Sequence, residues 1–435
     1  MKAILVTAIL SAVAIGAQAE DGTLRAFVGA RVIPIAGPEL ADGVLVVRGS
    51  TLEAVGPRSA TAVPPGAEIV DLAGRVVMPG LVDTHSHIAG VEGADGSAPI
   101  QPDIRVLDAL DVRDPSVRRA RAGGITTVNV MPGSGHLSSG QTLYLKLRDG
   151  RTIDDFLILD RDGRIAGGLK MANGTNSRRD PPFPGTRAKS AALVRERFIA
   201  ALEYRAKLAD VGESGGERPA RDLGLEALLE VLDGKRVVHH HTHRHDDIAT
   251  VLRLQDEFGF RVVLHHVSEG WRMAPEIAAA GVPCSIIAVD SPGGKSEARE
   301  LSFETGGVLE RAGVSVSLHS DDWITDSRLL LRSAALLVRG GMSREGALRA
   351  VTLEAARQLD LGDRVGSLEP GKDADFVVLS GDPLSIYTRV LETWVEGRRV
   401  FDLDDPDDRL AADGGYGAGR GQHAHVECFS QEDER

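Results

Sequence analysis

The sequence predicts an α/β protein in which a (β/α)8 (TIM) barrel is joined to a small β-sandwich domain that both ends of the chain build. Short strand-like runs separated by Gly and Pro fill residues 24–77, and similar strand-like runs occur again at 365–401. Between them, strand-like and helix-like stretches alternate over roughly 280 residues, which is typical of parallel βα units. An open, doubly wound sheet is the alternative arrangement of the same units.

The N-terminus carries the pattern of a secretory signal peptide over residues 1–19. Lys2 precedes an apolar run, and Ala17-Gln18-Ala19 follows it as a cleavage site of small residues. An uncleaved membrane anchor is the alternative, but the run is short for a bilayer span and no charged stop follows it. We therefore expect export, to a bacterial periplasm, with the mature chain beginning near Glu20.

The remaining domain boundaries follow from changes in composition and in the pattern of predicted strands and helices along the chain. We expect the first part of the sandwich at 20–77, the barrel at 78–362 and the second part of the sandwich at 363–403. Residues 174–225 interrupt the barrel rhythm and are predicted to form an insertion over one barrel end, with a helix near 189–209. Residues 404–435 are rich in Gly and Asp, which predicts a flexible acidic tail.

Six segments after residue 120 are the predicted strands of the middle region, and three amphipathic segments are its clearest predicted helices. The strands are expected at 125–131, 164–172, 236–241, 261–267, 282–289 and 315–321. The helices are expected at 246–258, 272–281 and 328–341.

Composition excludes several classes of partner. The formal net charge of −13 argues against nucleic-acid binding, which needs a basic surface, and aromatic residues at 4% are too few for base stacking. No segment beyond the signal peptide approaches membrane length, so no stable membrane insertion is expected after cleavage. A small molecule or a dipeptide is the expected substrate, and a homo-oligomer is left open.

Potential ligands stand at the ends of five predicted strands. "MPGLVDTHSH" (78–87) ends a strand on two histidines, and the later strand ends supply a lysine, two histidines and an aspartate. Because the carboxyl ends of barrel strands meet at one face, these side chains are expected to converge there. The set is His85, His87, Lys170, His241, His266 and Asp321.

Imidazoles and a carboxylate are suitable ligands for a divalent ion, most simply Zn²⁺, bound as one ion or two. Lys170 needs a separate explanation, because an ammonium beside a dication is repelled. Its side chain must therefore point away, lose its proton or be modified. Reaction of its amine with CO2 gives a carbamate whose two oxygens can bridge two cations, so a carboxylated Lys170 is the favoured hypothesis and a surface or salt-bridged lysine is the alternative. Loop histidines that bind no metal are the plainer alternative for His85 and His87.

The histidine-rich strands leave the choice of ligand open in places. His239 shares a strand face with His241, and His240 and His243 are close competitors. His265 and His266 alternate in direction, so one of the two is expected to pack outward. Asp322 beside Asp321 is interpreted as the cap of a following helix.

The combination of these motifs resembles the amidohydrolase superfamily, and within it the imidazolonepropionase-like group. "MPGLVDTHSH", the strand-end histidines, "SD" at Asp321 and "GSLEPGKDADFVVL" carry the resemblance, which covers residues 24–402. It implies a TIM barrel with a split β-sandwich, the metal set His85, His87, His241, His266 and Asp321, and Lys170 as a bridging carbamate.

The resemblance also implies hydrolysis of a C–N bond in an amide, cyclic amide or dipeptide by metal-activated water. Asp321 is expected to take the proton from water and hand it to the leaving nitrogen. His136 and Arg244 are candidate substrate-binding residues, the latter for a carboxylate. Hydrolysis of a lactone or ester on the same site is one alternative, and metal binding without catalysis through "HHHTHRH" is another.

Overall fold

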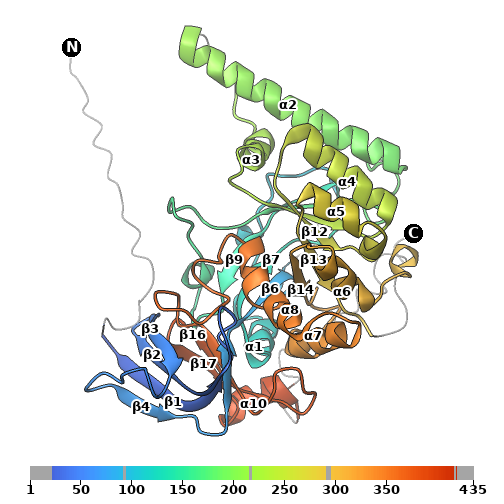
Figure 1. Ribbon diagram of the computed structural model, residues 1–435. Coiled ribbons are helices and arrows are strands. Elements are labelled where there is room, and N and C mark those ends of the chain that lie inside the picture. The colour runs from blue at the N-terminus through green and yellow to red at the C-terminus, as the bar shows by residue number, and fades with distance from the viewer. Residues whose placement is uncertain (1–21, 92–94, 215–217, 291–294, 416–417, 419–435) are drawn as a thin grey trace, which may run out of the picture.

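The computed structural model describes residues 22–91, 95–214, 218–290, 295–415 and 418 of the chain (Figure 1). The predicted signal peptide and most of the predicted tail lie outside these residues. Among the described helices, none is both long and apolar enough to cross a bilayer.

Both ends of the chain contribute to one mixed eight-stranded sheet, at the lower left of Figure 1. The strand order is β17-β16-β15-β5-β1-β2-β3, and β4 pairs with β1. The predicted meeting of the two chain ends is therefore confirmed, within a single hydrogen-bonded sheet. Its strands are β1 (Leu24–Val32), β2 (Leu40–Arg48), β3 (Thr51–Pro57), β4 (Glu68–Asp71), β5 (Val76–Pro79), β15 (Phe376–Leu379), β16 (Val390–Val395) and β17 (Arg398–Asp402).

Aromatic residues from both parts of the chain fill the core of this sheet. Phe27 of β1 meets Phe376 of β15 edge to face at 4.9 Å between ring centroids, and meets Trp394 of β16 at 5.0 Å. Phe376 and Trp394 stack on each other. Buried aromatic pairs of this geometry add to the free energy gained from area burial alone, so the two chain ends stabilise each other.

The middle of the chain forms two further sheets from strands that are mostly parallel. One has the order β6-β7-β9 and the other β14-β13-β12-β11-β10-β8. The strands are β6 (Leu81–Ser86), β7 (Ile125–Val130), β8 (Ser138–Gln141), β9 (Leu143–Lys146), β10 (Leu169–Ala172), β11 (Val238–Thr242), β12 (Val262–His266), β13 (Cys284–Ile287) and β14 (Val316–His319).

Hydrogen bonds join these two sheets at both edges. At one edge, the N–H of Asp321 donates to the carbonyl of His85 (2.9 Å), which links the end of β14 to β6. At the other edge, the N–H groups of Thr142 and Tyr144 donate to the carbonyls of Gly168 and Ala166, which precede β10 (3.0 and 3.1 Å). β8 and β9, which run antiparallel to their neighbours β10 and β7, were not predicted. The Gly-rich run at 133–140 obscured β8, because Gly is depleted in strands.

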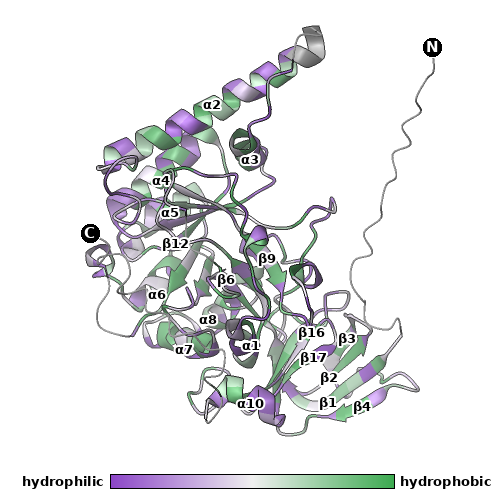
Figure 2. Ribbon diagram, turned by 180° about the vertical axis from the view of Figure 1, so that it is seen from behind, coloured by the Kyte–Doolittle hydropathy of each residue, from purple (hydrophilic) through white to green (hydrophobic). Residues whose placement is uncertain are grey.

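The helices lie around these strands. Strands are mostly hydrophobic in Figure 2, as expected where helices cover them, whereas α2 alternates along its length. The helices are α1 (Pro115–Ala122), α2 (Arg187–Ser214), α3 (Leu223–Leu232), α4 (His245–Phe258), α5 (Ala274–Ala280), α6 (Glu304–Arg311), α7 (Leu330–Arg339), α8 (Arg344–Ala350), α9 (Leu353–Gln358) and α10 (Pro406–Asp413). The predicted helices at 246–258, 272–281 and 328–341 correspond to α4, α5 and α7 within a few residues.

The segment predicted as an insertion contains α2 and α3, which pack on each other, and α2 also packs on α4 (Figure 1). Phe198 of α2 stacks on Phe258 and Phe260, which precede β12, with ring centroids 5.1 and 5.3 Å apart. The middle of α2 therefore packs near the starts of the strands, and only its first residue, Arg187, approaches their carboxyl ends through Asp247.

The predicted tail begins with an ordered element. α10 packs on α1, and the guanidinium of Arg328 donates to the carbonyls of Ala411 and Ala412 (3.1 and 3.2 Å). Asp405 caps α10 by accepting from the N–H of Asp407 (2.8 Å). The sequence prediction missed this helix because its eight residues carry too few apolar side chains to show periodicity.

A buried lysine ties the mostly parallel strands to the eight-stranded sheet. The amine of Lys146 in β9 lies 2.5 Å from Asp375 and 2.8 Å from Asp373, both just before β15. Burial disfavours the charge on this amine, but the two carboxylates outweigh that effect and raise its pKa. The ion pair therefore holds two separately formed sheets in one orientation.

We expect Lys146→Met to destabilise the protein by about 3–5 kcal/mol, because it leaves buried carboxylates without their counter-charge. Denaturant unfolding of the variant and the wild type measures the difference. Lys235→Met is the matched control, since Lys235 pairs with Asp233 at the surface and exposed pairs contribute only about 0–1 kcal/mol. Equal losses for both variants would contradict the anchoring role of Lys146.

Candidate metal centre

Asp321 and the two histidines of the first strand meet at the carboxyl ends of β6 and β14. Oδ1 of Asp321 lies 3.1 Å from Nε2 of His87 and 3.3 Å from Nε2 of His85. The two histidine Nε2 atoms are 3.3 Å apart, and both rings are buried. These three atoms therefore lie within 3.3 Å of one another, close enough to bind one cation. The backbone hydrogen bond between β14 and β6 fixes the register that brings them together.

His266 and Asp321 share an unusual backbone conformation. Their φ angles are +70° and +50°, in the left-handed region that residues other than Gly rarely adopt. Strain of this kind persists only where surrounding contacts determine it, and it is concentrated at functional sites. The turn at His266 places its Nδ1 3.9 Å from Oδ2 of Asp321, so β12 joins the same cluster.

The side chain of Lys170 reaches into this cluster. Its side chain is completely buried, and Nζ lies 3.1 Å from Nε2 of His85 and 3.0 Å from Sδ of Met131. Burial lowers the pKa of this amine to about 7, against the opposing pull of the Asp321 carboxylate. At neutral pH a substantial fraction of Lys170 is therefore the neutral amine.

His241 lies beside His266, with ring centroids 4.4 Å apart. Its ring is buried, yet neither nitrogen has a hydrogen-bond partner among the described residues. The same is true of Nε2 of His266. Since buried polar atoms are nearly always partnered, these atoms are the ones expected to receive a ligand.

The structure thus brings five of the six predicted ligands into one network of short contacts and places the sixth, His241, against His266. His85, buried in the low-dielectric interior, has a pKa far below its ordinary value, and the same holds for His241 and His266. Neutral imidazoles are the form that binds a metal, so no proton competes at neutral pH. The assignment of individual ligands stays a prediction.

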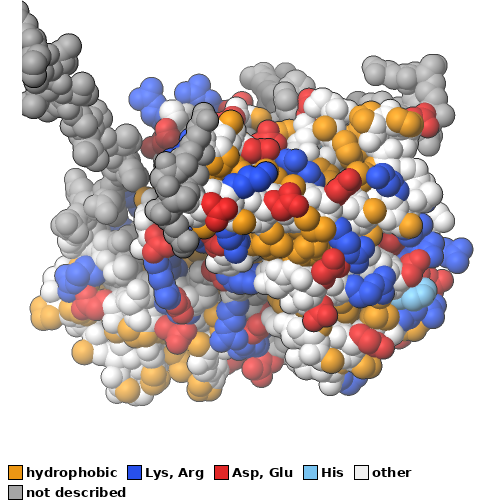
Figure 3. All heavy atoms as spheres, turned by 90° about the horizontal axis from the view of Figure 1, so that it is seen from above, with side chains coloured by type: hydrophobic (Ala, Val, Ile, Leu, Met, Phe, Trp, Pro, Cys, Tyr) orange, Lys and Arg blue, Asp and Glu red, His pale blue; other side chains and the backbone are white. Residues whose placement is uncertain are grey.

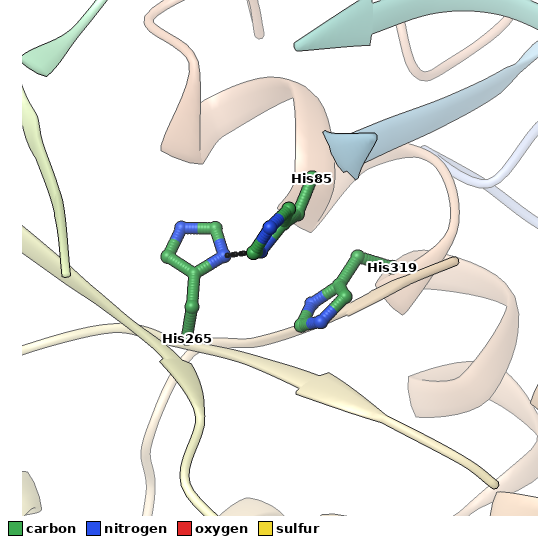
Figure 4. Close-up of side chains that lie close together, drawn as sticks. All are labelled: His85, His265 and His319. Atoms are coloured by element: carbon green, nitrogen blue, oxygen red, sulfur yellow. Dashed lines mark hydrogen bonds between the residues drawn. The ribbon is translucent and has the colours of Figure 1, made fainter. Parts of the chain in front are cut away.

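The prediction that one of His265 and His266 packs outward was wrong. The ring of His265 is buried, and its Nδ1 lies 3.2 Å from Nδ1 of His85 (Figure 4). Alternation of side chains holds only for regular strand backbone. The left-handed turn at His266 breaks it and lets both rings reach the interior.

His319 was also missed, although it stands two residues before Asp321. Its Nε2 lies 3.2 Å from Nδ1 of His266, and its Nδ1 lies 2.7 Å from Oγ of Ser285. His85, His265 and His319, the three rings drawn in Figure 4, form a group that could hold an ion. The signal in the sequence was the strand alternation itself, which puts His319 and Asp321 on one face.

The two predicted substrate-binding residues do not lie in this cluster. His136 is buried against the ring of Phe183, and its Nε2 is 3.4 Å from the guanidinium of Arg179. Arg244 is held by Asp246 through two hydrogen bonds of 2.9 and 3.0 Å. Their roles stay predictions. Asp322 accepts from the N–H of Ser327 (3.0 Å), but the cap of the 3-10 helix at Ser327–Leu329 is Asp326, so the capping role predicted for Asp322 was wrong.

A hydrogen-bonded chain runs from His85 away from the cluster. Nδ1 of His85 contacts Nδ1 of His265, whose Nε2 lies 3.0 Å from Nδ1 of His239. Nε2 of His239 lies 2.8 Å from the hydroxyl of Tyr144. If Nε2 of His85 offers its lone pair to an ion, each ring must donate outward, and Tyr144 must accept at the end of the chain.

Tyr144→Phe removes that last acceptor and leaves the ring N–H of His239 buried without a partner. We expect about tenfold weaker zinc binding, at the lower end of the usual effect of residues behind a metal ligand. Competition with a chromophoric chelator measures the zinc affinity. Tyr204→Phe on α2 is the control, because its hydroxyl contacts Glu226 instead. Unchanged affinity in Tyr144→Phe would show that the chain does not orient His85.

An α/β fold with buried histidines and a carboxylate at the strand ends is typical of metal-dependent hydrolases. A family model described as amidohydrolase family matches residues 229–401. The crystal structure of an amidohydrolase from Thermotoga maritima MSB8 is similar with a TM-score of 0.80 and 32% identity, over 87% of this chain and 99% of that one. The chain belongs to the amidohydrolase family, and the resemblance inferred from its motifs is confirmed.

Curated relatives are similar at lower identity. Amidohydrolase tasK from Hapsidospora irregularis is 29% identical over 393 residues, which is 83% of this chain and 40% of that protein. The present chain therefore spans less than half the length of that relative. The imidazolonepropionase of Pseudomonas putida is 27% identical over 370 residues, covering 77% of this chain and 87% of that protein.

Proposed function

We propose that the protein is an exported metal-dependent amidohydrolase that cleaves a C–N bond in an amide, a cyclic amide or a dipeptide. The observation that carries the proposal is the convergence of Asp321 on both His85 and His87 within 3.3 Å. The names of the relatives, amidohydrolase and imidazolonepropionase, support a C–N substrate. The strand connections support a (β/α)8 barrel with a sandwich-like sheet domain as the underlying architecture.

The donor set fits a divalent ion such as Zn²⁺, because neutral imidazoles and an ionised carboxylate face one another without other partners for several of their atoms. His85, His87, His241, His266 and Asp321 are the residues that would hold it. When bound, such an ion lowers the pKa of water and polarises a carbonyl group.

Asp321 is the residue proposed to move the proton. Burial opposes its charge, yet the hydrogen bond from His87 and nearby positive charge hold its pKa well below the usual range. The carboxylate is therefore ionised and can accept a proton from water at Oδ2, the oxygen that does not contact His87. The same oxygen can then return the proton to the leaving nitrogen.

Lys170 is proposed to carry a carbamate. Its lowered pKa provides the neutral amine that reacts with CO2, with loss of one proton, to give an anion in place of a cation. That anion would lie beside His85 and could bridge two cations.

Removing the metal tests the proposed function. We expect a chelator to abolish hydrolysis of dipeptides, N-acyl amino acids or cyclic amides, and Zn²⁺ to restore it. Full activity in metal-free protein would contradict the mechanism, and activity confined to lactones or esters would favour the alternative substrate. Metal binding without hydrolysis of any of these substrates would favour a metal-binding protein.

Single substitutions separate ligands from neighbouring residues. His87→Ala and His266→Ala should lower the bound metal, because both side chains contact Asp321 at the cluster. His245→Ala is the control, since its half-exposed ring pairs with Glu269 instead. Metal analysis after dialysis gives the result, and equal losses in all three variants would point to unspecific binding by the histidine-rich run.

Lys170→Ala should reduce the metal content from about two ions toward one, if the carbamate bridges them. A short carboxylic acid added to this variant should partly restore activity by occupying the bridging position. Metal content and activity are measured together on the same preparations. A fully active wild type with a single ion, and an unaffected variant, would contradict the bridge.

We further propose that the protein acts in the periplasm on a small molecule or dipeptide, without nucleic acid as a partner. Figure 3 supports the second point, because acidic and basic side chains are interspersed on the face it shows. Sequencing the N-terminus of the exported protein tests the first point, with a mature start near Glu20 expected.

A further inference from the structure

The loops that follow β7 and β10 hold the guanidinium of Arg179 against three neighbouring groups. Arg179 belongs to the segment predicted as an insertion, and its Nη2 donates to the carbonyl of Gly135 (2.9 Å). The same atom lies 3.4 Å from Nε2 of His136. The guanidinium also lies over the ring of Phe183, 3.8 Å from the ring centroid, at the distance of a cation–π contact. A carbonyl, an imidazole and an aromatic face therefore fix this cation in one position.

No carboxylate of the described residues forms an ion pair with Arg179. Burial alone lowers the pKa of its guanidinium, and no neighbouring carboxylate opposes that shift. The charge acts instead on His136, whose pKa is lowered first by burial and then by Arg179. A guanidinium that is partly desolvated and has no counter-charge within the protein is a site for an anion, and planar carboxylates fit its donors best.

Two other arginines near these strand ends are already paired. Arg244, which the sequence suggested for binding a carboxylate, donates two hydrogen bonds to Asp246 (2.9 and 3.0 Å). Arg187 donates to both oxygens of Asp247 (2.9 Å each). A substrate carboxylate would have to displace an internal carboxylate to bind either of them, whereas Arg179 needs no such exchange.

Lys295, in the loop that follows β13, is a further cation close to the candidate centre. Burial lowers the pKa of its amine, and the carboxylates of Asp321 and then Glu297 oppose that shift. Glu297 is itself buried and lies beside His241 and His243. The charge of Lys295 is therefore offset within the protein, unlike the charge of Arg179.

A short run of chain connects Arg179 with the candidate metal centre. The carbonyl of Met131 accepts from Nδ1 of His87 (2.8 Å), and four residues further on the carbonyl of Gly135 accepts from Arg179. Four residues span at most about 14 Å even when fully extended. The guanidinium therefore lies at the same end of the strands as the centre, where one end of a bound substrate can reach it.

We propose that Arg179 binds a free carboxylate of the substrate, at the end remote from the bond that is cleaved. This inference rests on the proposed hydrolase function and narrows its substrates to dipeptides, N-acyl amino acids and other amides that carry a carboxylate. Nε and Nη1 of Arg179 make no hydrogen bond within the described part of the chain, so donors remain for the ligand. The role predicted for Arg244 is assigned to Arg179 instead.

Paired substrates test this assignment. Each dipeptide or N-acyl amino acid that the zinc-loaded wild type hydrolyses is compared with its C-terminal carboxamide, which has the same shape and no charge. We expect the wild type to prefer the carboxylate about tenfold or more in kcat/KM. Arg179→Gln should lose that preference through a higher KM for the carboxylate with little change in kcat, because the contact is made equally before and during the reaction. Unchanged hydrolysis of the carboxamide shows that the variant is folded.

Arg161→Gln is the matched control, because Arg161 pairs with Asp363 at the surface, and it should keep the wild-type preference. Full preference in Arg179→Gln, equal losses toward both forms of the substrate, or equal hydrolysis of both forms by the wild type would overturn the inference and leave the proposed function standing. Loss of preference in Arg244→Gln but not in Arg179→Gln would return the role to Arg244. Hydrolysis of neither form by the zinc-loaded wild type would instead overturn the proposed function.

Discussion

Two backbone hydrogen bonds between the ends of β6 and β14 are the constraint on which the candidate centre depends. The N–H of Asp321 donates to the carbonyl of His85, and the N–H of His87 donates to Asp322 (2.9 and 3.2 Å). They set the register in which one carboxylate meets two imidazoles. A slip of one residue would turn the side chains to the other face, so the site requires this pairing more than any single contact between side chains.

Burial decides which atoms of the centre remain available. Ring nitrogens that point away from the cluster are hydrogen-bonded: Nδ1 of His87 to the carbonyl of Met131, Nδ1 of His319 to Ser285 and Nδ1 of His243 to Ser268. Both ring nitrogens of His241 and Nε2 of His266 have no partner among the described residues. Because an unpartnered buried polar group is unfavourable, a bound ligand is favoured at these atoms.

The sequence predicted those features that depend on one strand at a time. The strand-end positions of His85, His87 and Asp321 followed from the location of functional groups in parallel barrels, and their convergence is observed. Glu297 could not be predicted, because its place depends on Thr175 and His243, which approach it from other loops. The antiparallel strand β8 was missed for a different reason, since its residues, with Gly among them, have weak strand preference.

The left-handed turn at the end of β12 explains how the adjacent side chains of His265 and His266 both reach the interior. With regular backbone, His265 and His266 would point to opposite faces, and only one ring could reach the interior. At φ +70° the ring of His266 turns toward Asp321, while His265 keeps its contact with His85. A backbone outlier of this kind costs about 1–3 kcal/mol, and Gly would relieve it only by removing the ring. Hydrogen bonds from the next residue, Val267, to Thr242 (2.9 Å) and His265 (3.0 Å) hold the turn. The strained turn therefore places one imidazole beside Asp321 and the other against His85.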